Sequence, residues 1–118
     1  MQKELLTKKN YAAIGEEISH ELAVDFVHAF RTNFPTEQPG FTVGRDIIDQ
    51  ILAQPGCVGI RLYNAINEEG QKTMVYLGID ADGNNLLKRT VVMQDGTIAQ
   101  DDAIVADRLG GLPAWPWF

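Results

Sequence analysis

The chain has 118 residues, 45% hydrophobic and 22% charged, which is the composition of one folded domain rather than of a disordered segment. Ten Lys and Arg against sixteen Asp and Glu give a net charge of −6. This argues against nucleic acid as a partner, because phosphate contacts need clustered basic side chains. The single cysteine, Cys57, excludes an internal disulfide and a thiolate zinc site.

The first seventeen residues are polar and weakly patterned, and we expect them to be frayed or loosely helical. They contain no apolar segment of signal-peptide length. No run of about 18 apolar residues occurs in the sequence, so a membrane span is not expected. We therefore expect a cytoplasmic protein without a membrane partner.

A helix is predicted to begin after Ser19, whose hydroxyl can cap it, and to stop before Pro35. Apolar residues recur along one side of this helix: Leu22, Phe26, Val27, Phe30 and Phe34. A second helix is predicted over residues 43–54, with Thr42 as its cap and Pro55-Gly56 after it.

Two antiparallel strands are predicted next, at residues 57–63 and 72–80, joined by a turn at residues 67–70. If Asn64 lies opposite Thr73, apolar residues face one another in three pairs: Leu62 with Val75, Ile60 with Leu77, and Val58 with Ile79. We expect these six side chains on one buried face, packed against apolar residues of both helices: Phe26, Phe30, Ile48 and Leu52.

A third strand is predicted within residues 86–93, and Asp95-Gly96 indicates a hairpin to a short fourth strand at residues 97–99. Asp101 can cap a short last helix that ends at Gly110-Gly111. The predicted fold is a single α+β domain. Two N-terminal helices pack on a three- or four-stranded antiparallel meander, followed by a short C-terminal helix and an aromatic tail.

The residues that suggest a metal site or a nucleophile do not have the spacing or position that such a site requires. His20 and His28 are eight residues apart, about 12 Å along a helix, so one ion cannot bind both. Residues 80–85 resemble the start of a calcium loop, but glycine and glutamate are misplaced, which favours a plain turn. Ser19 is the only serine and lies at a helix start. We expect no metal and no cofactor.

The face of the strand pair opposite the apolar one is the best candidate for function. In the register above it carries Gly59, Arg61, Tyr63, Met74, Tyr76 and Gly78. Arg61 would lie opposite Tyr76, close enough for a cation–π contact, and the glycines would leave a bare patch of sheet. Two interpretations remain open: a helix covers this face, or a ligand or partner binds it.

The tail at residues 112–118 carries three aromatic residues between prolines: Trp115, Trp117 and Phe118. Such an apolar load needs to be buried, either on its own domain or in a neighbouring subunit. We hypothesise a homodimer formed through this tail, with a contribution from the Arg61/Tyr76 face.

The sequence ILAQPGCVGIRLY at residues 51–63, with GIDADG at residues 78–83, resembles a group of small uncharacterised bacterial proteins. The resemblance implies a compact α+β fold and brings no activity with it. The residues favour a non-catalytic module that binds a protein or a small ligand. The alternative is a small enzyme that uses a pocket at Arg61, Tyr63 and Tyr76.

Overall fold

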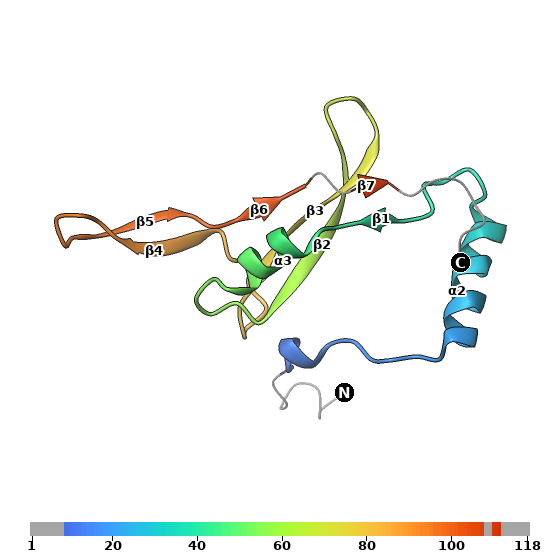
Figure 1. Cartoon of the computed structure of the whole chain (residues 1–118), viewed down its shortest axis with the longest axis horizontal. Helices are drawn as coiled ribbons and strands as arrows, with labels where there is room; N and C mark the ends of the chain where they lie inside the picture. Colours follow the sequence, from blue (N-terminus) through green and yellow to red (C-terminus); the bar gives the residue numbers. More distant parts are fainter. Residues whose placement is uncertain (1–8, 108–109, 112–118) are drawn as a thin grey trace.

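The structure is a computed structural model that describes residues 9–107 and 110–111 (Figure 1). It is an α+β fold, as the sequence predicts. Its elements in chain order are a 3₁₀ turn η1 (Tyr11–Ala13), α2 (His20–Asn33), β1 (Phe41–Thr42), α3 (Arg45–Leu52), β2 (Gly59–Ile66), β3 (Lys72–Ile79), β4 (Lys88–Val92), β5 (Ile98–Asp102), β6 (Val105–Ala106) and β7 (Gly110–Gly111). The described strands form a three-stranded antiparallel sheet, β2-β3-β6, and two separate pairs, β4-β5 and β1-β7.

Helix α2 begins where the sequence predicts, but it does not pack on the sheet as expected. The Ser19 hydroxyl accepts a hydrogen bond from the Leu22 amide at 3.1 Å, which caps the helix. We expected Phe26 and Phe30 to pack on the sheet, and this is wrong, because both are exposed. Residues 34–40 lead α2 into β1 at one end of the molecule instead of turning it back over the sheet (Figure 1).

The chain is accordingly extended. Its radius of gyration is 18.1 Å, against about 13.5 Å for a compact domain of this length. None of the fourteen residues of α2, all of which the structure describes, is buried. Neither of the described helices is both long and apolar enough to cross a membrane.

Helix α3 is the helix that packs on the sheet. It begins after Gly44 rather than after Thr42 and ends at Leu52, so it is shorter than predicted. Its residue Ile51 is fully buried. Among the described residues the buried apolar side chains are Ile51, Tyr76, Leu77, Ile79 and Ala103. Most of them come from the second half of β3, whose two faces are both buried, with α3 covering the face of Gly78.

The predicted register of β2 and β3 is wrong by one residue. Asn64 pairs with Met74 and Leu62 with Tyr76. The cause is the turn, in which the Gly70 amide donates to the Asn67 carbonyl and the Asn67 amide to the Gln71 carbonyl. Gly70 has φ +78°, so it adds a bulge residue and makes a three-residue loop. A one-residue shift exchanges which face of β3 accompanies each face of β2.

Two further turns repeat this geometry. Asp80 and Asn84 close one around Gly83, and Met93 and Thr97 close the other around Gly96. The second turn joins β4 to β5, so the predicted hairpin there is confirmed. The first returns the chain along β3, where Asn85 bridges to Ile79.

The predicted last helix is wrong within the described residues. β5 continues to Asp102, and the Ala103 amide then donates to the Leu87 carbonyl. β6 pairs with the free edge of β3, with Tyr76 opposite Ala106. Pairing with β6 satisfies backbone N–H and C=O groups at the edge of β3, which a separate short helix would leave unpaired. The aromatic tail, residues 112–118, lies outside the described residues.

The described part of the N-terminal segment contacts the turn after β3. Tyr11, in η1, lies against the turn at Gly83, where a Cβ atom would be 2.6 Å from the tyrosine hydroxyl oxygen. Gly83 has φ +84°, so this turn favours glycine for two reasons. Of the segment expected to be frayed or loosely helical, residues 9–17 are described, and their helical structure is this short 3₁₀ turn.

Candidate functional site

The two faces of the sheet separate the residues that the sequence grouped as one site. Residues opposite one another in an antiparallel pair point to the same face. Arg61 pairs with Leu77, and Tyr63 with Val75. Tyr76 belongs to the other face, with Leu62. One face therefore carries Gly59, Arg61 and Tyr63, and the opposite face carries Met74, Tyr76 and Gly78.

Helix α3 covers the Gly78 end of the second face. A Cβ atom on Gly78 would lie 3.3 Å from Ile51 Cγ2 and 2.8 Å from Cys57 Sγ. The open question of whether a helix covers this patch is thus answered there: α3 does, and Gly78 makes room for it.

Tyr76 is part of the core. It is 2% exposed, and its hydroxyl donates to the Asp107 carbonyl at 3.0 Å. Burial raises the pKa of Tyr76, and the nearby Asp107 carboxylate raises it further. The hydroxyl is therefore held neutral, as a hydrogen-bond donor that fixes the chain after β6.

Arg61 and Tyr63 meet through an asparagine. Arg61 Nη1 donates to Asn85 Oδ1 at 2.6 Å, and Asn85 Nδ2 donates to the Tyr63 hydroxyl at 2.8 Å. The expected cation–π contact between Arg61 and Tyr76 is wrong, because the two side chains are on opposite faces. The network links β2 to the strand segment after β3 and gives Arg61 a neutral partner.

Residues 80–85, the acidic segment after β3, form a hydrogen-bonded turn. Asp80 Oδ1 accepts hydrogen bonds from the amides of Asp82 and Asn84, both at 2.9 Å. The carboxylate therefore organises backbone donors, as the sequence interpretation of a plain turn requires. Within residues 9–107, no three His, Cys, Asp or Glu side chains gather into a possible metal site.

A row of exposed apolar side chains, spaced four residues apart, runs along α2 and the residues that flank it. We call these five side chains the α2 ridge: Ile18, Leu22, Phe26, Phe30 and Phe34. All are exposed, Phe26 to 58% and Phe34 to 51%. The sequence showed this stripe, but its assignment to the internal core concealed it as a surface.

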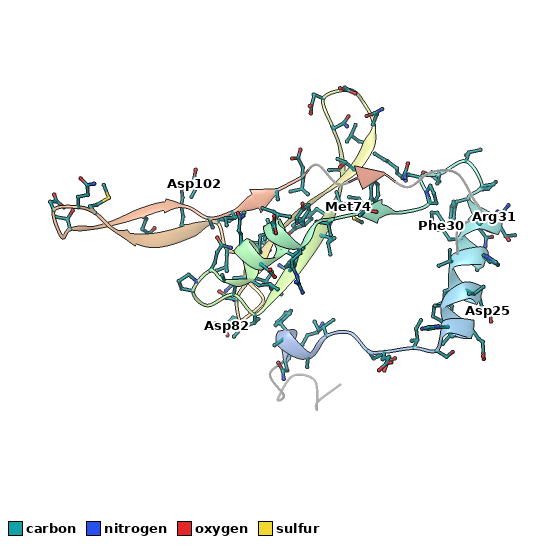
Figure 2. All side chains as sticks on the ribbon, viewed as in Figure 1. Asp25, Phe30, Arg31, Met74, Asp82 and Asp102 are labelled. Carbon is teal, nitrogen blue, oxygen red and sulfur yellow. The ribbon has the colours of Figure 1, made fainter. Side chains whose placement is uncertain are left out.

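A groove lies where α2, β1 and the β2-β3 hairpin approach one another. Its volume is about 430 Å³, and its lining is Phe30, Gln38, Pro39, Gly40, Phe41, Asn64, Lys72, Thr73 and Met74. Figure 2 labels Phe30 on the side of α2 nearer the sheet, and Asp25 and Arg31 on the outer side. Lys72 Nζ pairs with Glu37 Oε2 at 2.8 Å at this groove. The rings of Phe30 and Phe34 lie 5.0 Å apart.

The predicted interface residues Trp115, Trp117 and Phe118 lie outside the described residues. Comparison with known proteins adds no assignment, because no protein-family model, no curated protein and no solved structure matches the chain. The functional argument therefore rests on the geometry above.

Proposed function

We propose that the chain is a cytoplasmic, non-catalytic protein-interaction module that forms a homodimer through the α2 ridge. The observation that carries this proposal is that α2 buries none of its fourteen described residues while its phenylalanines are exposed. A continuous apolar surface of this kind typically marks an interaction site.

Helix α2 needs such a contact to be stable. Isolated helices shorter than about 12–15 residues are marginal in water, and most helical stability in proteins comes from packing an apolar face. The Ser19 cap contributes on the order of 1 kcal/mol, which does not replace that packing. A partner surface on the ridge supplies the missing contacts.

A second copy of the chain fits the pattern of the ridge. An isologous contact requires a surface that is complementary to itself. The ridge is symmetric about Phe26, with Leu22 and Phe30 one turn away on either side. Rows spaced by four residues pack into one another at crossing angles near about −50°. Two antiparallel α2 helices can therefore cross at Phe26, with their dipoles opposed.

The experiment is sedimentation velocity on the full chain at tens of micromolar. We expect a dimer that Phe26→Ser converts to a monomer, because Phe26 is the centre of the ridge. The matched control is His28→Ser, two residues away and roughly 200° around the helix. That variant should remain dimeric.

A wild-type chain that sediments as a monomer across this range would refute the proposal. Dimers that persist in Phe26→Ser would show that association uses another surface.

The alternative of a small enzyme has less support. It needs Arg61, Tyr63 and Tyr76 in one pocket, whereas Tyr76 lies on the opposite face from the other two. Tyr76 is also buried and bonded to the Asp107 carbonyl, so it has no path to a substrate.

A further inference from the structure

We propose that residues 112–118 of the same chain dock in the groove between α2, β1 and the β2-β3 hairpin, with Trp115 and Trp117 against Phe30 and Met74. This is an acceptor site within one chain, and it goes beyond the proposed self-association through α2.

The strand pair β1-β7 delivers the tail to this groove. Phe41 pairs with Gly111, and Thr42 with Gly110, in an antiparallel ladder. An antiparallel continuation of this ladder beyond Gly111 would run beside Gly40 toward Pro39 and Gln38. Gln38, Pro39, Gly40 and Phe41 all line the groove. The tail thus enters the groove at its β1 wall.

The tail is long enough to run beside α2. The six residues from Leu112 to Trp117 can extend over about 20 Å. Helix α2 has fourteen residues and is about 21 Å long. Pro113 and Pro116 favour an extended backbone, which keeps the tail reaching along a groove instead of coiling on itself.

The groove has the chemistry that tryptophan needs. Phe30 and Phe41 offer ring faces and edges, and Met74 offers a thioether that packs well against aromatic rings. Asn64 provides an amide oxygen within the lining, which suits an indole N–H. An amphipathic aromatic side chain can therefore bury its ring there while its N–H reaches a polar partner.

Tryptophan fluorescence reads this site directly, because Trp115 and Trp117 are the only tryptophans of the chain. We expect the emission of the full chain to be blue-shifted and protected from acrylamide. Phe30→Ala should raise the acrylamide quenching constant roughly twofold or more, because it removes an aromatic wall. Leu87→Ala is the control: Leu87 is an exposed apolar residue outside both the groove and α2, and its replacement should leave the emission unchanged.

The same measurement separates docking within one chain from docking on a neighbour. The blue shift should survive dilution to the monomer, because the tail and the groove belong to the same chain. Loss of the shift on dilution would mean that the tail binds a second copy, which overturns the proposal. Emission like that of free indole at every concentration would overturn it as well.

Methionine methyl NMR gives a second test that does not depend on the stability of α2. With ¹³C-methyl labelling, the Met74 resonance should move when Trp115 and Trp117 are replaced by alanine, because ring currents are lost. Met93, exposed in the turn between β4 and β5, is the internal control and should not move. An unchanged Met74 resonance would place the tail elsewhere.

Discussion

Cys57 Sγ lies so close to Gly78 that a Cβ atom on Gly78 would be only 2.8 Å from it. The thiol also donates to the Gly59 carbonyl at 3.3 Å, which fixes the chain between α3 and β2. Glycine at position 78 therefore lets α3 and the Cys57 segment close on β3. This contact is a packing requirement of the core rather than a reactive thiol site.

Gly78→Ala should lower the free energy of unfolding by about 1–3 kcal/mol, because the added methyl group overpacks the space beneath α3. Urea unfolding measures this loss. Gly59→Ala is the matched control, since its Cβ would lie 3.6 Å from Ile79, an ordinary contact distance.

The two residues should be coupled. In a Cys57→Ala background the Gly78→Ala change should cost less, because the nearest atom has been removed. If Gly78→Ala is as mild as Gly59→Ala, the close packing of Cys57 on β3 is incorrect.

Gln54 is 7% exposed and ties α3 to the segment between β5 and β6. Its Oε1 accepts from the Ile104 amide at 2.9 Å, and its Nε2 donates to the Ile51 carbonyl at 3.1 Å. Gln54→Ala leaves the Ile104 amide unsatisfied and should cost about 1–3 kcal/mol in thermal or urea unfolding. Exposed Gln50, within α3, is the control, and Gln50→Ala should change stability by less than about 0.5 kcal/mol. Equal effects would contradict the bridging role.

Alkaline pH should weaken the fold through Tyr76. Burial and the Asp107 carboxylate hold its folded-state pKa above the ordinary 10.0. Below about pH 10 the tyrosine is neutral in both states and its contribution to stability is fully present. Above that pH the unfolded state ionises first, so stability falls as pH rises through the folded-state pKa.

Urea unfolding on both sides of this pH tests the sign. Tyr76→Phe should lose less stability on raising the pH than the wild-type chain does. Tyr63→Phe removes an exposed tyrosine and should behave as the wild type. Identical pH profiles for all three proteins would contradict the assignment.

The sequence predicted those features of the fold that depend on neighbouring residues alone, namely a helix start and a hairpin turn. Ser19 marks the start of α2, and Asp95-Gly96 marks the β4-β5 hairpin, because caps and turn residues act within a few positions of the chain. The predicted register of β2 and β3 was wrong because of one residue, Gly70. Gly70 takes a positive φ and adds a bulge, and matched apolar pairs could not show which loop length the turn would adopt.

The rest depended on contacts distant in sequence. Nothing local tells residues 103–106 to join the edge of β3 instead of forming a helix. The grouping of Arg61 with Tyr76 followed from the register error, since a one-residue shift places them on opposite faces. The apolar stripe of α2 was visible, but a pattern gives the side that is buried and not the molecule that buries it.

Hydrogen exchange of the α2 amides around Phe26, measured on the full chain over a range of concentrations, tests the central claim most directly. We predict protection that is stronger at tens of micromolar than after dilution or in Phe26→Ser, while the amides of β3 stay protected throughout. Fast exchange of these α2 amides at every concentration, or protection that does not depend on concentration, would contradict a homodimer built on the α2 ridge.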